Sequence, residues 1–489
     1  MAELHAPRTP LPTTPEAMAA VAALVATART AQRRYETFTQ QQVDEVCLAA
    51  GWAIMEPARN RELAELAVAD TGLGRVDDKI QKNHRKTFGL LRDLARVRSV
   101  GVISEDAATG IVEIARPVGV VAAVTPSTNP AATPANKVIN ALKGRNAVIV
   151  APSPKGASTC ARLLAFVHAE LARIGLPRAL AEGLVQMLPT PIGKSLTHAL
   201  MMQADLVVAT GSQANVRAAA LSGTPAFGVG AGNVASIVDE GADPVAAAQR
   251  IVRSKTFDNA TSCSSENSLI VVGAAAEGVM QALRELGCVM LDATQKAALQ
   301  VRMWPDGNLS AAVIAQDAGD VARGAGLTAV ADLAPRVLMV EEDGFGAAHP
   351  FSGEKLSPVL AVYRARDFAH ACRIVESIYA YQGAGHSVSL HAPAETAAQR
   401  ALQLGQTLPV SRVIVNQAHC VATGGSFDNG LPFSLSMGCG TWGGNNFSDN
   451  MTWRQYVNIT RIAMPIPERV PTEAEVFGDY FARHGRGAG

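Results

Sequence analysis

The spacing of hydrophobic residues changes along the chain, and each change predicts a different kind of structure. From residue 15 to about 97, apolar side chains recur at helical spacing, as at Val43, Val46 and Ala50, which predicts helices. Residues 99–117 then carry short β-branched runs around a polar turn, which indicates a hairpin. Little beyond local pairing would hold this hairpin, so we expect it to protrude.

After Val118, short apolar runs alternate with helical patterns. The runs predict strands at 120–124, 147–151, 184–188 and 206–209, with helices at about 134–142, 158–174 and 192–201 between them. Such alternation favours a parallel sheet covered on both faces, with ligands at the carboxyl ends of its strands. A second α/β unit begins near Val234 and includes strands at 269–272, 337–340 and 413–415. The sequence therefore predicts two doubly wound α/β domains, with glycine- and serine-rich cleft walls at 424–444.

Composition narrows the classes of function. The 489 residues are 48% hydrophobic and 18% charged, with 43 Lys and Arg against 43 Asp and Glu. This balance argues against a disordered chain and against a nucleic-acid partner bound by bulk positive charge. No apolar stretch reaches the roughly 20 residues of a membrane span. The alanine-rich run at 17–26 lacks the basic flank of a signal peptide, so neither nucleic acid nor membrane is expected as a partner.

The cysteines indicate a reducing compartment. The seven of them lie apart, none in a CxxC pair, at positions 47, 160, 263, 288, 372, 420 and 439. Neither a disulfide framework nor a structural zinc site is therefore expected. We predict a cytoplasmic protein that binds no metal.

Cys263 is the candidate nucleophile. It lies in a run of hydroxyl and amide side chains, residues 254–268, between a helical pattern and a strand. Thiols in irregular polar segments can meet a substrate, whereas a structural cysteine packs as a small hydrophobe, which these polar neighbours disfavour. No cation is adjacent in sequence, so we expect the backbone N–H groups of Ser264 and Ser265 to lower the pKa of the thiol.

Six motifs in order resemble the CoA-acylating branch of the aldehyde dehydrogenase superfamily, over about residues 30 to 465. They read TPSTNP (125–130), GVGAGN (228–233), FDN-x3-C (257–263), EKLSPVL (354–360), GAGH (383–386) and TWGGN (441–445). The resemblance implies a cofactor domain (1–98 and 118–232), a catalytic domain (233–452) and oligomerisation segments (99–117 and 453–489). It also implies a homodimer or homotetramer.

The resemblance assigns catalytic roles. The thiolate of Cys263 would add to an aldehyde, and Asn129 with the backbone N–H of Cys263 would stabilise the oxyanion. Taken alone, without the other motifs, Asn129 before Pro130 is better interpreted as a turn residue. His386 matches a family histidine that assists acyl transfer to the thiol of coenzyme A, although a satisfied loop histidine is an equal alternative.

One departure from the hydrolytic members predicts the product. Those enzymes carry a glutamate that activates water, and Val229 stands at about that position here. Without this base the thioester would pass to coenzyme A rather than to water, and the reaction would also run in reverse. The glycines of 228–233 do not form a dinucleotide fingerprint, because the third is misplaced and no helix pattern opens there.

The cofactor contacts implied by the resemblance come from several loops. Gly211 and Ser212 match the helix start that faces the pyrophosphate, Glu354 matches the carboxylate on the nicotinamide ribose, and Thr125 belongs to the same site. In the loop 151–156, Pro154 replaces the glutamate that contacts the adenosine ribose, with Ser153 and Lys155 beside it. NADP or NAD is therefore expected, with NADP mildly favoured.

The aldehyde is the least determined feature. Hydroxyl side chains surround the cysteine, at Thr261, Ser262, Ser264 and Ser265. Such a lining suits an anionic or strongly hydrated substrate, which favours sulfoacetaldehyde over succinate semialdehyde or acetaldehyde. A hydrolytic dehydrogenase and a catalytically silent relative are further alternatives. The first is disfavoured by the missing glutamate, and the second by the presence of Cys263.

Overall fold

The computed structural model describes residues 11–487, and its first part is helical, as expected. Four helices precede any strand: α1 (Pro15–Tyr35), α2 (Gln40–Met55), α3 (Pro57–Thr71) and α4 (Val76–Leu94). A capping box between Thr39 and Gln42 starts α2, and Gly72 ends α3 with a φ of 66°. Helix α1 packs on α7 and α8, whereas α2 packs on α5 and α6, so these helices cover the first sheet.

The first sheet has five parallel strands in the order β5-β4-β3-β6-β7. Its strands are β3 (Val120–Thr125), β4 (Ala147–Pro152), β5 (Val185–Met187), β6 (Leu206–Ala209) and β7 (Ala226–Gly228). The connecting helices are α5 (Ala132–Lys143), α6 (Ala157–Arg173), α7 (Arg178–Leu184), α8 (Lys194–Gln203) and α9 (Gln213–Leu221). The predicted strands and helices are confirmed, except that the sequence analysis did not anticipate the short elements α7 and β7.

The second sheet has seven parallel strands in the order β10-β11-β12-β9-β8-β13-β14. They are β8 (Val234–Val238), β9 (Glu266–Val272), β10 (Cys288–Leu291), β11 (Val337–Glu341), β12 (Val359–Ala365), β13 (Val388–His391) and β14 (Val413–Val415). Its helices are α10 (Pro244–Thr256), α11 (Ala275–Glu285), α12 (Ala293–Met303), α13 (Ala318–Gly324), α14 (Thr328–Ala331), α15 (Phe368–Tyr381), α16 (Ala394–Thr407) and α17 (His419–Ala422). Separate hydrophobic cores line its two faces, so it is covered on both sides.

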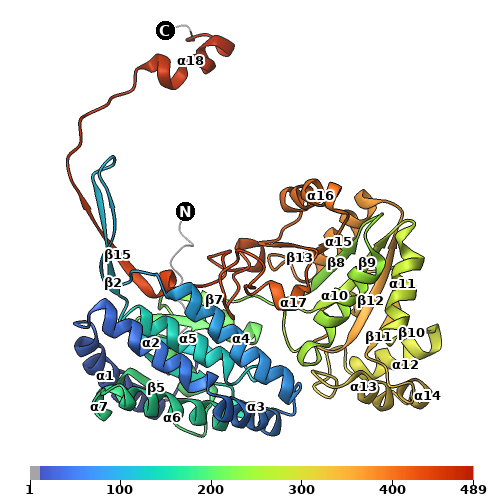
Figure 1. Ribbon diagram of the computed structural model, residues 1–489, viewed down its shortest axis with the longest axis horizontal. Coiled ribbons are helices and arrows are strands. Elements are labelled where there is room, and N and C mark those ends of the chain that lie inside the picture. Colours follow the sequence, from blue (N-terminus) through green and yellow to red (C-terminus); the bar gives the residue numbers. More distant parts are fainter. Residues whose placement is uncertain (1–10, 488–489) are drawn as a thin grey trace.

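A three-stranded antiparallel sheet projects from the helical side of the first sheet (Figure 1). Its hairpin, β1 (Gly101–Asp106) and β2 (Ile111–Pro117), confirms the predicted hairpin, and β15 (Val457–Ala463) pairs with β2. From β15 an extended arm leads to α18 (Glu473–His484), none of whose residues is buried. Within the described residues, no helix is both long enough and apolar enough to cross a bilayer.

The cysteines separate into two groups by burial. All seven are free, and Cys263 alone among them is not classed as fully buried. The other six lie in or beside the hydrophobic cores, as expected of packing residues.

Candidate active site

Opposite ends of the two parallel sheets supply the predicted site residues. Asn129 follows the carboxyl end of β3, and Gly211 follows that of β6. Cys263 instead precedes β9, and His386 precedes β13, so the second sheet contributes the amino ends of its strands. The expectation of ligands at carboxyl ends therefore describes the first sheet only.

A strained turn positions Cys263. Between α10 and the cysteine, Asp258, Asn259 and Ala260 have φ values of 52°, 50° and 59°. Left-handed backbone costs a non-glycine residue of order 1–3 kcal/mol, so surrounding contacts must hold this turn. Asp258 supplies them, because its carboxylate accepts from Lys82 Nζ at 2.5 Å and Lys79 Nζ at 3.2 Å. Burial alone would raise the pKa of Asp258, but these two charges outweigh it and hold the pKa below its ordinary value.

His386 lies against the cysteine. Its Nε2 is 3.4 Å from Cys263 Sγ, and its Nδ1 is 2.7 Å from Ser387 Oγ. Burial, reinforced by the charge of Arg412, holds the pKa of His386 well below its ordinary value. The imidazole is therefore neutral at physiological pH, and with the proton on Nδ1 its Nε2 can accept the thiol proton.

The surroundings of Cys263 favour the protonated thiol. Burial raises the pKa of Cys263, the nearby Glu354 carboxylate adds to the effect, and Arg412 opposes it. The expectation that N–H groups of Ser264 and Ser265 lower this pKa is wrong. The Ser264 amide donates to Ser262 Oγ at 3.3 Å and the Ser265 amide to Ser262 O at 3.0 Å, so neither serves the sulfur. The thiol must therefore lose its proton when sulfur attacks, and His386 Nε2 is the group in contact with the sulfur.

Asn129 is oriented by a lysine that the sequence analysis missed. Lys82 Nζ donates to Asn129 Oδ1 at 2.8 Å, so the Nδ2 hydrogens are the end of the amide left for a ligand. Lys79, Lys82 and Lys86 are only 3%, 5% and 8% exposed. Their spacing along α4 places them on one helix face. The sequence did hold a signal for this, because the three lysines recur at helical spacing on a helix face that would be apolar if it only packed against the core.

The loop from β7 to β8 touches the nucleophile. A Cβ on Gly232 would lie 1.9 Å from the Cys263 carbonyl oxygen, so only glycine fits there. Val229, the residue matched to the missing glutamate, is 4% exposed and contributes no base. Burial raises the pKa of Glu354 to about 8, although the Gly232 amide and Lys255 favour its charged form. Glu354 thus lies near both the loop and the thiol.

The predicted cofactor residues gather where the first sheet changes winding direction. Thr125 ends β3, whereas Ser153 and Gly211 follow β4 and β6. The crevice between β3 and β6 is the switch point of this strand order. Ser212 caps α9 by accepting from the Asn215 amide at 3.3 Å. Within residues 11–487, the buried Thr125 Oγ1 has no hydrogen-bond partner. An orphaned hydroxyl beside a helix start fits a phosphate-containing ligand.

A small enclosed cavity adjoins the cysteine loop. Its volume is about 60 Å³. Its lining combines the oxyanion candidate, the residue before the nucleophile and several cations: Gln81, Lys82, Arg85, Lys86, Asn129, Arg253, Phe257, Ser262, Cys420, Val421 and Leu435. The cavity therefore offers space for the non-reacting end of a small substrate.

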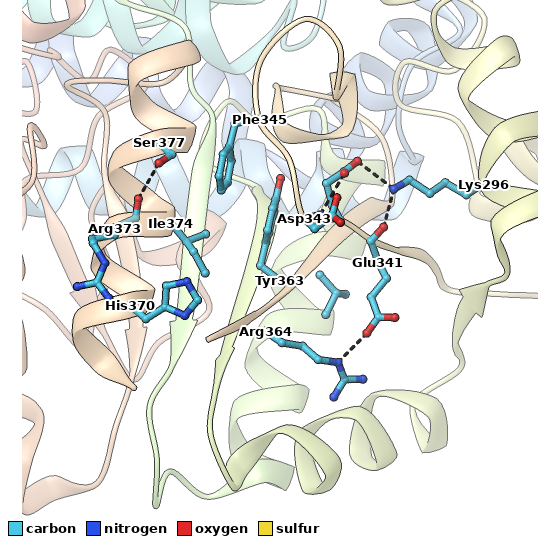
Figure 2. Close-up of a pocket in the computed structure, with 12 residues that line it drawn as sticks. Lys296, Glu341, Asp343, Phe345, Tyr363, Arg364, His370, Arg373, Ile374 and Ser377 are labelled. Atoms are coloured by element: carbon cyan, nitrogen blue, oxygen red, sulfur yellow. Dashed lines mark hydrogen bonds and ion pairs between the residues drawn. The ribbon is translucent and has the colours of Figure 1, made fainter. Parts of the chain in front are cut away.

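A larger cavity of about 790 Å³ lies at the opposite, carboxyl edge of the second sheet (Figure 2). None of the predicted site residues lines it. Lys296 pairs with Glu342 at 3.1 Å, and Arg364 pairs with Glu341 at 2.6 Å. Tyr363 stacks on Phe345 with ring centroids 5.5 Å apart. Arg373 in the same lining has no ion pair among the described residues, but neither the cysteine nor any other predicted site residue lies here, so this cavity does not compete as the reaction site.

Comparison with known proteins agrees with this geometry. The aldehyde dehydrogenase family model matches residues 7–290. The chain is 66% identical to a sulfoacetaldehyde dehydrogenase (acylating) of Cupriavidus necator, over 99% of this chain and 97% of that protein. It is 35% identical to a succinate-semialdehyde dehydrogenase (acetylating) of Clostridium kluyveri, over 93% and 98% of the two chains.

The fold comparison points the same way. The solved structure of an acetylating aldehyde dehydrogenase from Geobacillus thermoglucosidasius matches with a TM-score of 0.87 and 33% identity. The match covers 94% of this chain and 99% of that one. The chain therefore belongs to the aldehyde dehydrogenase family.

Proposed function

We propose that the protein is a CoA-acylating dehydrogenase that converts sulfoacetaldehyde, coenzyme A and NAD(P)+ to sulfoacetyl-CoA and NAD(P)H. The observation that carries the proposal is the contact of 3.4 Å between Cys263 and neutral His386, beside the cavity that Asn129 lines. The 66% identical relative is named for the same aldehyde and for acylation. Acetaldehyde and succinate semialdehyde are the alternative substrates.

The first step forms a covalent adduct at the cysteine. His386 Nε2 takes the thiol proton as Cys263 Sγ attacks the carbonyl carbon, giving a hemithioacetal whose oxygen is negative. The amide of Asn129, held by Lys82, donates to that oxygen. Such a donor is worth roughly 2.7–4 kcal/mol in comparable sites.

The second step leaves a thioester on Cys263. The nicotinamide cofactor supplies the hydride acceptor for the carbon of the adduct. With Val229 in place of a glutamate, no carboxylate at that position activates water. The thiol of coenzyme A attacks instead. His386, once it has released the first proton to solvent, takes the proton of the incoming thiol and returns it to Cys263 Sγ as the thioester bond breaks.

The same residues support the cofactor proposal. Thr125, Gly211 and Ser212 would hold the phosphate-bearing part of NAD(P) at the switch point, and Glu354 would hold the nicotinamide ribose. Lys155 is exposed beside Ser153, and no acidic side chain occupies the place of Pro154. This arrangement tolerates a 2′-phosphate, so we favour NADP over NAD.

We also propose a homodimer or homotetramer assembled through the hairpin and the C-terminal arm. The arm and α18 expose large apolar side chains, including Met464, Val470 and Phe477. Isolated helices of this length are marginal in water, so a second copy would stabilise α18. Phe477→Glu combined with Tyr480→Glu should shift sedimentation toward smaller species, whereas Val301→Glu, at a more exposed apolar site outside the arm, should not. An unchanged distribution in the double variant would contradict this assembly.

The free cysteines support a reducing compartment. All seven lack a disulfide, and six are buried where oxidation would disturb packing. We therefore place the enzyme in the cytoplasm. Fractionation of cells that express the tagged full chain tests this, and recovery in an oxidising compartment would contradict it.

Measuring NAD(P)H formation with three aldehydes tests the function. Sulfoacetaldehyde, acetaldehyde and succinate semialdehyde are each supplied with and without coenzyme A, using NAD and NADP in turn. We expect turnover that requires coenzyme A and is fastest with sulfoacetaldehyde. Sustained turnover without coenzyme A, with release of a free acid, would show a hydrolytic enzyme instead.

A further inference from the structure

The cavity beside Asn129 carries an excess of positive charge. Four cations line it, Lys82, Arg85 and Lys86 from α4 and Arg253 from α10, and its lining contains no carboxylate. Lys82 is compensated by the neighbouring Asp258, at 2.5 Å. Among the described residues, Arg85, Lys86 and Arg253 have no ion pair of this kind.

Arg85 and Lys86 are held by groups that do not neutralise them. Arg85 donates to Val421 O at 3.0 Å and to Ser426 Oγ at 2.7 Å. Lys86 Nζ donates to Gly424 O at 2.8 Å. Carbonyl and hydroxyl oxygens satisfy hydrogen-bond donors and fix their direction, but they leave the local charge positive. Burial lowers the pKa of Lys86 to about 7, so the two arginines provide most of the lasting charge.

Arg253 is the free member of the cluster. Among residues 11–487, no carboxylate forms an ion pair with it, and its side chain is exposed. Burial lowers the pKa of Arg85, Asp428 opposes this, and the charge of Arg253 lowers it further, so the two guanidinium groups act on each other. Asp428 lines an adjoining cavity together with both arginines, but no carboxylate lines the cavity at Asn129, so on that side the two guanidinium groups can bind an anion.

The position of the cluster defines what that anion belongs to. Asn129 and Ser262 form the reactive end of the cavity, and Arg253 also lines two adjoining cavities on the outside. A volume of about 60 Å³ accommodates roughly four water-sized groups. An aldehyde whose carbonyl reaches Asn129 would thus place a substituent only a few atoms away among the cations.

We propose that Arg253 and Arg85 bind the sulfonate of the substrate and so determine which aldehyde the enzyme prefers. This inference rests on the proposed function, and it names the residues that distinguish sulfoacetaldehyde from uncharged aldehydes. Arg85 is fixed in advance by Val421 and Ser426, so little side-chain freedom is lost on binding.

The test compares charged and uncharged substrates in matched variants. Arg253→Gln should lower kcat/KM for sulfoacetaldehyde by roughly 10–100-fold, since a hydrogen bond to a charged group is lost, and should change that for acetaldehyde less than about threefold. Arg85→Gln should have the same effect on the two substrates. Because Arg85 also donates to Val421 O and Ser426 Oγ, the exposed Arg253 is the decisive position. Arg178→Gln is the control, because Arg178 on α7 is exposed, pairs with Glu182 and lines none of these cavities.

A second readout does not depend on turnover. Ethanesulfonate should bind the wild-type enzyme, measured by calorimetry, and its affinity should fall by a similar factor in Arg253→Gln. An equal loss with both aldehydes, or unchanged ethanesulfonate binding, would overturn the proposal. A raised KM for coenzyme A alone would overturn it as well and assign the cluster to the phosphates of coenzyme A. If the wild type oxidises none of the aldehydes with coenzyme A, the proposed function fails, and ethanesulfonate binding still decides whether the cluster is an anion site.

Discussion

The two cavities contain similar side chains but differ in how their charges are balanced. In the cavity beside Asn129, Arg85 and Arg253 have no carboxylate among the lining residues. In the larger cavity of Figure 2, Lys296 and Arg364 are each paired with a glutamate. A count of charged residues would favour the second cavity. The comparison teaches that charge left without a partner, close to a nucleophile, marks a binding site better than size does.

The largest expected difference in kcat between variants of the two cavities comes from removing the oxyanion donor. Asn129→Ala is expected to lower kcat by roughly 10²–10³-fold, since one preorganised donor to the oxyanion is lost. Tyr363→Phe removes a hydroxyl that donates to Gly344 O in the larger cavity, and should change kcat less than about threefold. Steady-state assays with coenzyme A measure both. Equal losses would mean that the larger cavity takes part in the reaction.

The pH dependence of thiol labelling tests whether Cys263 is protonated in the free enzyme. Because burial raises the pKa of Cys263, the thiolate fraction should grow about tenfold per pH unit from pH 6 to 9. The rate of inactivation of the free enzyme by iodoacetamide should rise accordingly. Cys263→Ala provides the control for labelling elsewhere. A rate that levels off below pH 7 would show a depressed pKa and contradict the protonated resting state.

The smallest effect on activity is expected for a substitution in the larger cavity. Removing a cation there should lower the stability of the fold instead. Burial would raise the pKa of Glu342, but His349 and Lys296 outweigh it and hold the pKa below its ordinary value. This carboxylate thus stabilises the fold above its unfolded pKa, and the contribution is lost as pH falls through the folded pKa.

Lys296→Met should accordingly lower the free energy of unfolding at pH 7 by about 1–3 kcal/mol, with kcat/KM changed less than threefold. The deficit should shrink as pH falls through the folded pKa of Glu342, where the carboxylate becomes protonated. Urea unfolding at several pH values measures it, with Arg323→Gln as the surface control. A loss of activity at full stability would refute the distinction between the two cavities.

Local patterns in the sequence were sufficient for most of the fold. Apolar runs bounded by turn residues predicted β3, β4 and β6 almost to the residue, because these strands are buried on both faces. The strand β7 escaped because it has only three residues, Ala226–Gly228, and too few positions to show a period. The seven-stranded order was not predictable, since β10 joins the sheet edge across two later strands.

The site was less predictable because its contacts join distant parts of the chain. Cys263, Asn129 and His386 were proposed from motifs, and the structure brings Cys263 and His386 together. Lys82 was missed, since its partner Asp258 lies 176 residues further along the chain. The direction of the Ser264 amide was mispredicted because a local hydrogen bond to Ser262 competes for it.

The short connection from β7 to β8 joins the two parallel sheets beside the nucleophile. Residues 229–233 are the first crossing of the chain between the two parallel sheets, and Gly232 lies against the carbonyl of Cys263. At this crossing, any rotation of one lobe against the other must be taken up within five residues, and the displacement reaches the peptide that carries the sulfur. A movement of one lobe relative to the other would therefore displace Cys263, because the connecting segment is only five residues long.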